Sequence, residues 1–173
     1  MTHRPPDAAI RPNSVPWPPL LYGAALVVGL ALAWLWPVGG AASAFPGGLE
    51  VWRVWWPVRL AGLVLLACGL GLDVWAMATM HQARTNILPH RAADRLVTRG
   101  PFAWTRNPIY VGNTLALAAI GVMLLNVWLV VAAILAALAT DRLAARREEA
   151  HLAARFGADF EAYRKCVPRW LWC

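Results

Sequence analysis

The chain has 173 residues and a net charge of +7, and 60% of its residues are hydrophobic while 14% are charged. Soluble domains average about 45–50% apolar and about 25% charged residues, so this composition excludes an ordinary soluble domain and indicates a bilayer. Eleven Trp residues point the same way, because indole rings favour the membrane interface. The basic residues flank apolar segments and form no continuous basic face, which favours membrane lipids over nucleic acid as partners.

Apolar runs predict four membrane helices, since a spanning helix needs about 20 largely apolar residues. The first two are expected at 17–36 and 56–80. The next two, 109–125 and 127–140, are shorter and are divided by Asn126. They predict a helical hairpin that just reaches across the bilayer or stops slightly short of it.

Lys and Arg residues predict the orientation. The segment 37–55 has only Arg53, whereas 81–108 has five Arg residues and the chain after 140 has seven basic residues. Basic segments stay in the cytoplasm, so both termini are expected there. The prediction is an all-α integral membrane bundle with a cytosolic helical tail. Its single domain, 1–173, divides into an N-terminal segment (1–19), two membrane helices (17–80), a cytosolic loop (81–108), a hairpin (109–140) and the tail (141–173), with tail helices expected at 144–155 and 159–165.

The end of the loop 81–108 carries a candidate anion site. Pro108 suits the first turn of the third helix, and Asn107 would be its N-cap. A helix N-terminus attracts anions, and Arg106 stands beside this one. The alternative is that Arg106 and Asn107 only cap a membrane helix and anchor it to headgroups.

Three carboxylates stand out. Asp73 lies inside the second helix, where a charge is costly and indicates function; the alternative is an ion pair with a loop residue such as Arg84. Glu148 and Glu149 are adjacent, and helical neighbours point about 100° apart, so at most one faces a given pocket squarely. Their alternative is a salt-bridged, solvated surface helix.

Other chemistries find no support in the sequence. His81, His90 and His151 lack metal-ligand spacing, and no Cys-x-x-Cys pair exists, so no metal site is predicted. Cys68 is interpreted as a small packing residue in the second helix. No glycine-rich nucleotide loop follows a strand, which argues against a Rossmann fold or P-loop.

Several motifs follow one another in a recognisable order between about residues 80 and 170. They are Thr85 to His90, Leu-Val-Thr-Arg-Gly-Pro-Phe at 96–102, Arg-Asn-Pro-Ile-Tyr-Val-Gly at 106–112, Glu148-Glu149, Arg-Phe-Gly at 155–157 with Phe160 and Tyr163, and Val-Pro-Arg at 167–169. This ordered set resembles the isoprenylcysteine carboxyl methyltransferase and phospholipid methyltransferase superfamily, the first motif its bacterial members. Many members have His where this chain has Asn107.

The resemblance implies an integral membrane methyltransferase of the bacterial inner membrane that uses S-adenosylmethionine. Its substrate would be a lipid or other hydrophobic molecule with a carboxylate, amine or thiol acceptor. The loop, the hairpin and the tail would form a cytosol-facing cofactor pocket. By motif, the cofactor-binding residues are Gly100, Pro101, Arg106, Asn107, Pro108, Tyr110, Gly112, Glu148 and Glu149, and the catalytic group is Arg106, Glu149 and Arg169, with Arg169 near an acidic substrate group.

Methyl transfer by displacement needs alignment more than acid–base catalysis, so the lack of a catalytic dyad does not count against this activity. Two alternatives remain: an NADPH-dependent membrane reductase of the same superfamily, and a non-catalytic membrane scaffold. The methyltransferase hypothesis predicts that Arg106→Ala or Glu149→Gln weakens cofactor binding without unfolding the protein.

Overall fold

The computed structural model describes residues 17–36, 38, 49–85 and 95–171, with the helix but not the side chains for 49–55. Most of the expected N-terminal segment, His90 and Cys173 lie outside the described residues. Within the described part every regular element is helical, which confirms the all-α prediction. The elements are α1 (Trp17–Leu35), α3 (Leu49–Gln82), η2 (Gly100–Ala103), α4 (Pro108–Met123), α5 (Val127–Thr140), η3 (Asp141–Ala145), α6 (Arg146–Phe156) and α7 (Ala158–Cys166).

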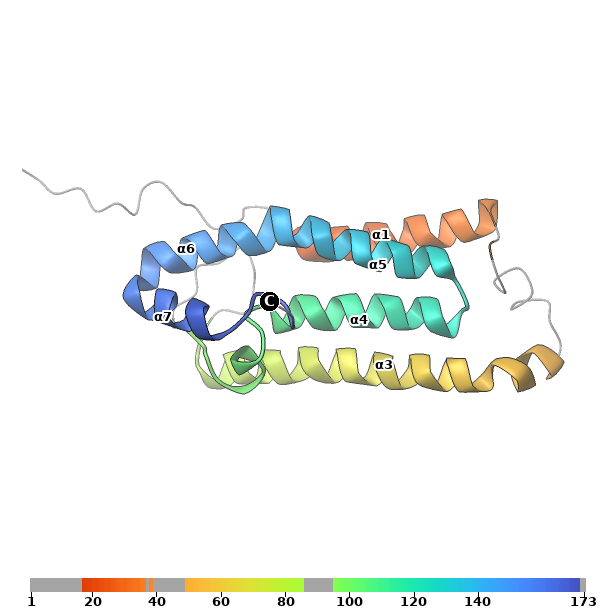
Figure 1. Cartoon of the computed structure of the whole chain (residues 1–173), viewed down its shortest axis with the longest axis horizontal. Coiled ribbons are helices and arrows are strands. Elements are labelled where there is room, and N and C mark those ends of the chain that lie inside the picture. The colour runs from red at the N-terminus through yellow and green to blue at the C-terminus, as the bar shows by residue number, and fades with distance from the viewer. Residues whose placement is uncertain (1–16, 37, 39–48, 86–94, 172–173) are drawn as a thin grey trace, which may run out of the picture.

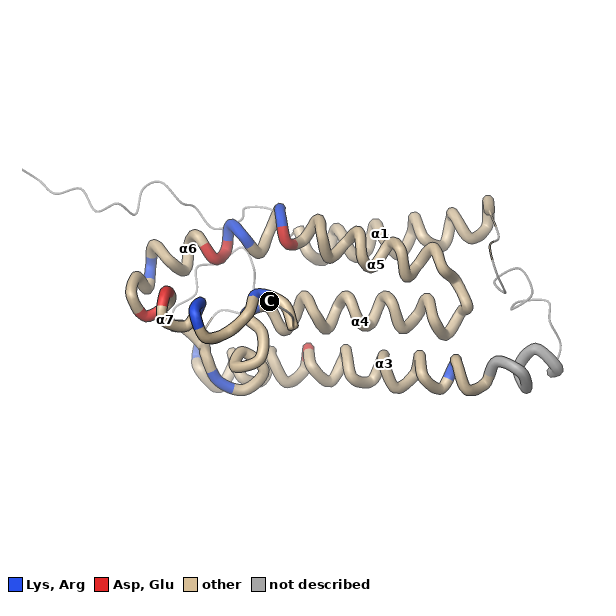
Figure 2. Tube along the Cα trace, in the orientation of Figure 1, with Lys and Arg blue, Asp and Glu red and all other residues tan. Residues whose placement is uncertain are grey.

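Four helices, α1, α3, α4 and α5, lie along the long axis of the molecule, and each runs opposite to the one before it (Figure 1). α4 packs on α3 and α5, and α1 packs on α5. The elements η2, α6 and α7 gather at the end where α3 finishes and α4 begins. Charged residues are concentrated at this end, which we call the polar end (Figure 2).

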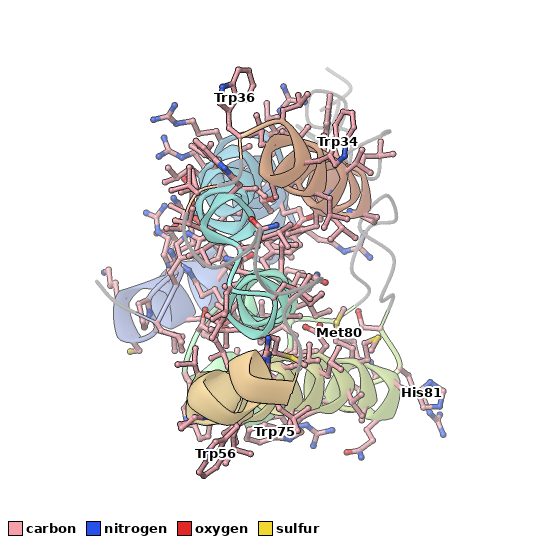
Figure 3. All side chains as sticks on the ribbon, turned by 90° about the vertical axis from the view of Figure 1, so that its right-hand side faces the viewer. Trp34, Trp36, Trp56, Trp75, Met80 and His81 are labelled. Atoms are coloured by element: carbon pink, nitrogen blue, oxygen red, sulfur yellow. The ribbon has the colours of Figure 1, made fainter. Side chains whose placement is uncertain are left out.

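In the part of the chain that the structure describes, three helices are long and apolar enough to cross a membrane: Trp17–Leu35, Trp56–Gln82 and Val127–Phe156. α4 is also apolar but has only 16 residues, a length of about 24 Å. The outer surface of the bundle is apolar, and Trp34, Trp36, Trp56 and Trp75 point away from it (Figure 3). Such a surface suits lipid, so the fold is a membrane bundle, while a fourth crossing stays a prediction.

The second helix is longer than predicted. α3 begins at Leu49, not near Trp56, and it continues through Pro57. Proline removes one backbone hydrogen bond. Unwinding the chain there would leave further backbone groups unpaired, which is costlier in an apolar setting, and this explains why the helix does not stop.

The hairpin also differs from expectation. α5 covers 127–140 as predicted, and the side chain of Asn126 caps it by accepting from the Leu129 amide at 3.2 Å. The helix does not end at Thr140, however, because a π-helical turn, η3, leads directly into α6. The sequence from Asp141 to Phe156 contains no Gly or Pro and is rich in strong helix formers. Gly157, at φ +51°, ends the helix.

Two glycines bring α3 and α4 into close contact. A Cβ on Gly69 would lie 2.8 Å from the Gly112 carbonyl oxygen, and a Cβ on Gly112 would lie 2.8 Å from the Gly69 carbonyl oxygen. A Cβ on Gly112 would also overlap the carboxylate of Asp73, with 2.6 Å to Asp73 Cγ. Only glycine allows this approach, so Gly112 shapes a helix crossing.

The structure corrects two predictions about α3. Asp73 forms no ion pair with Arg84, because it lies nine residues before the end of α3 and faces α4. Its buried Oδ1 has no hydrogen-bond partner among the described residues. Cys68 is exposed and is not a packing residue. It lies on the outer side of α3, since Gly69 occupies the side that meets α4.

Candidate functional site

The short helix η2 prepares the start of α4. Gly100 opens it at φ +63°, a conformation that favours glycine, and sits against α3, where an added Cβ would lie 2.9 Å from Thr79 Oγ1. From α7, the Tyr163 hydroxyl donates to the Phe102 carbonyl oxygen at 2.6 Å. Burial raises the pKa of Tyr163, which keeps its hydroxyl protonated as a donor. η2 is therefore fixed between α3 and α7.

Arg106 is held by α6, by α7 and by the residues that follow α7, all of which lie far from it in the sequence. Its backbone amide donates to the Pro168 carbonyl oxygen at 2.9 Å, and its Nη1 donates to the Arg164 carbonyl oxygen at 3.1 Å. Its Nη2 forms an ion pair with Glu149 Oε1 at 3.1 Å, and the side chain is only 9% exposed. The third nitrogen of the guanidinium, Nε, is buried and has no hydrogen-bond partner among the described residues.

Asn107 occupies the N-cap position of α4, as predicted, but its side chain makes no capping hydrogen bond. Its Nδ2 donates instead to the Arg169 carbonyl oxygen at 3.2 Å. The Thr105 hydroxyl donates to the same oxygen at 2.8 Å. A cap needs the side-chain oxygen to accept from an amide of the first turn, and no such bond forms, so the expected capping role is wrong. The side chain is directed instead to the segment after α7, which runs beside the start of α4.

Glu149 is saturated by guanidinium groups. The Arg169 guanidinium donates two hydrogen bonds to this carboxylate, from Nε to Oε1 at 2.8 Å and from Nη2 to Oε2 at 2.6 Å. Arg106 forms an ion pair with the same Oε1. The hydrogen bond to Glu149 raises the pKa of Arg169, so this guanidinium stays charged. The Glu149 side chain is 8% exposed, so the interpretation as a solvated surface residue is wrong for it.

Glu148 points to a different partner. The Tyr110 hydroxyl donates to Glu148 Oε1 at 2.7 Å, and this is the one hydrogen bond that joins Glu148 to another side chain in the described part of the protein. Tyr110 is buried, and its carbonyl oxygen accepts from the Tyr22 hydroxyl of α1 at 3.1 Å. Both adjacent carboxylates therefore face inward, each toward its own partner.

Asp141 also belongs to this group of contacts, although no motif in the sequence predicts it. Its Oδ1 accepts from Arg169 Nη1 at 3.2 Å and from Trp170 Nε1 at 3.1 Å, and its Oδ2 accepts from Arg146 Nε at 2.8 Å. One sequence feature could have indicated a role for Asp141, since this carboxylate comes directly after an apolar run. The sequence-based prediction places Asp141 only at the beginning of the tail.

The predicted site residues fall into three groups. Arg106, Asn107, Tyr110, Glu148, Glu149 and Arg169 come together at the polar end. Pro101 and Pro108 are fully buried beside them, and Gly100 meets the end of α3. Gly112 faces α3 and not this cluster.

A family model described as phospholipid methyltransferase matches residues 58–159, which is more than half of the chain. The chain belongs to the phospholipid methyltransferase family. The match includes Arg106, Glu148 and Glu149 but ends before Arg169. No curated protein and no solved structure matches the chain. Family membership implies a methyltransferase that acts on lipid-like substrates, and enzymes of this family generally use S-adenosylmethionine.

Proposed function

We propose that this protein binds S-adenosylmethionine at the polar end and transfers its methyl group to a hydrophobic or lipid substrate. One observation carries the proposal: the polar residues of separate family motifs, at 106, 148 and 149, meet in a single cluster. The excess of Arg at the same end supports a cytosolic position for it. In this proposal the protein lies in a bacterial inner membrane with both termini in the cytoplasm.

The residues present fit this cofactor. Arg106 Nε is a buried donor that lacks an acceptor among the described residues, and it stands beside the N-terminus of α4. A carboxylate, such as that of the methionine part of the cofactor, would satisfy both the donor and the helix dipole. Glu148 keeps acceptor capacity beyond its bond with Tyr110 and suits hydroxyl or ammonium donors.

Glu149 and Arg169 suit a different role. The hydrogen-bonding groups of Glu149 are used by Arg169 and Arg106, and all three Arg169 nitrogens bind carboxylates. This geometry favours Glu149 and Arg169 as residues that orient Arg106. It leaves little of the Arg169 guanidinium for an acidic substrate group.

When bound, S-adenosylmethionine supplies an electrophilic methyl group on a positively charged sulfur. The residues of the chain would bind and align the reactants, which can account for several kcal/mol of the barrier. A carboxylate or thiolate acceptor needs no base, and an amine acceptor needs only to be neutral. The apolar surface beside the polar end would admit such a substrate from the bilayer.

Calorimetric titration of S-adenosylhomocysteine into the detergent-purified protein, with NADPH in parallel, tests the proposal. We expect saturable binding of S-adenosylhomocysteine alone. Glu148→Gln should weaken it about 10- to 100-fold, the size of a lost hydrogen bond to a charged group, with an unchanged melting temperature. The matched control is Glu161→Gln on α7, where the carboxylate side chain is 41% exposed. NADPH binding alone would favour the reductase, and binding of neither by folded protein would favour the scaffold.

A further inference from the structure

We propose that Asp141 is a positioning residue of the candidate site: it fixes Arg169 and Trp170 and thereby holds the C-terminal segment against the start of α4. The inference rests on the proposed function, because the site it shapes is the one assigned to the cofactor. Asp141 forms its hydrogen bonds with Arg146, Arg169 and Trp170 and not with Arg106 or Glu148, so it acts on the site through its neighbours. It is 14% exposed in its side chain, so its hydrogen bonds are largely shielded from water.

The π-helical turn explains how one helix presents two carboxylates to one guanidinium. Asp141 and Glu149 are eight residues apart, and in a regular α-helix such residues point about 80° apart. Asp141 is the first residue of η3, and a π turn takes up about one additional residue. That residue brings the two side chains to within about 20° of each other. Both can then bind Arg169, as they do.

Asp141 completes the coordination of Arg169. Glu149 takes Nε and Nη2, and Asp141 takes Nη1, so every nitrogen of the guanidinium has a carboxylate acceptor. Two cations, Arg106 and Arg169, share the single charge of Glu149. Asp141 supplies a second negative charge beside Arg169, and its other oxygen pairs with the more exposed Arg146.

Asp141 also fixes the backbone that follows Arg169, because the same oxygen binds the indole of Trp170. The carbonyl oxygen of Arg169 in turn accepts from Thr105 and Asn107. One residue earlier, the Pro168 carbonyl oxygen accepts from the Arg106 amide. A shift of this segment would therefore move the residue assigned to the cofactor carboxylate.

The test compares Asp141→Asn and Trp170→Phe with Asp159→Asn, which removes an exposed charge on α7. In the full-length protein in detergent, we expect Asp141→Asn to weaken binding of S-adenosylhomocysteine about tenfold or more. Trp170→Phe should weaken it about threefold, and Asp159→Asn should leave it within twofold. All three should retain the melting temperature of the wild type within a few degrees. A lower melting temperature with unchanged affinity in Asp141→Asn would show a merely structural role and overturn the inference.

Hydrogen exchange at the Arg106 amide separates this inference from the proposed function. If the wild type binds no S-adenosylhomocysteine, the proposed function fails, and exchange then decides the positioning role. We expect faster exchange of this amide in Asp141→Asn and Trp170→Phe than in Asp159→Asn, since its acceptor is Pro168. Unchanged exchange would overturn the inference. If Asp141→Asn does not fold, Trp170→Phe decides by the same two measurements.

Discussion

The contact between α3 and α4 and the cluster at the polar end join the chain in opposite ways. Gly69 and Gly112 bring two helix backbones together by the absence of side chains. At the polar end, Arg106, Glu149 and Arg169 join segments far apart in the sequence through charged hydrogen bonds. The first contact depends on shape and the second on charge and direction. Each should therefore fail under a different kind of substitution.

The largest effect is expected at Glu149. Glu149→Gln removes the charge between two guanidinium groups, and loss of one partner from a buried ion pair costs about 3–5 kcal/mol. The sequence alone led us to expect weaker cofactor binding without unfolding. The contacts seen in the structure predict, in addition, that Glu149→Gln markedly lowers the melting temperature, measured by thermal unfolding in detergent. Glu161→Gln is the matched control, because its pair with Arg164 is exposed and should contribute less than about 1 kcal/mol. Equal losses in the two variants would contradict a special role for the buried cluster.

The next effect is expected at Gly112. Gly112→Ala places a methyl group against Asp73 and the Gly69 carbonyl oxygen, and overpacking of this kind costs about 1–3 kcal/mol. Adding Asp73→Ala should recover part of the lost melting temperature, because it removes the carboxylate but not the carbonyl oxygen. Gly71→Ala is the control, since nothing lies near its Cβ and the change should stabilise α3 by up to about 1 kcal/mol. A Gly112→Ala variant that is as stable as the wild type would contradict the close contact.

The sequence predicted the elements whose signals are local. The apolar run 127–140 follows a capping residue, and α5 has those bounds. The ordered motifs at 106–112 and 148–149 also pointed to side chains that meet in space. Their order was informative because family motifs reflect a common fold and not only local propensity.

The features that were missed depend on what lies opposite in space. Nothing local in Gly112 reveals that Asp73 faces it, so its placement in the cofactor pocket was a transfer by motif. The π turn that directs Asp141 toward Arg169 has no sequence signal of its own. Asn107 stands at the N-cap of α4, but its side chain makes no capping bond and donates to the Arg169 carbonyl oxygen, a neighbour that the local sequence does not reveal.

The smallest effect is expected at Tyr163, whose hydrogen bond joins α7 to η2. Tyr163→Phe removes the hydrogen bond to the Phe102 carbonyl oxygen and should cost about 1 kcal/mol, seen as a slightly lower melting temperature. The contribution of this hydroxyl to the free energy of unfolding also depends on pH, and the direction of that dependence follows from its pKa. Burial raises the pKa of Tyr163 above its ordinary value of 10.0, so the folded protein keeps a proton that the unfolded chain loses. This stabilisation is complete below pH 10.0 and declines above it. The advantage of the wild type over Tyr163→Phe should therefore shrink between about pH 10 and 11, and a constant difference across that range would show that the hydroxyl is not buried.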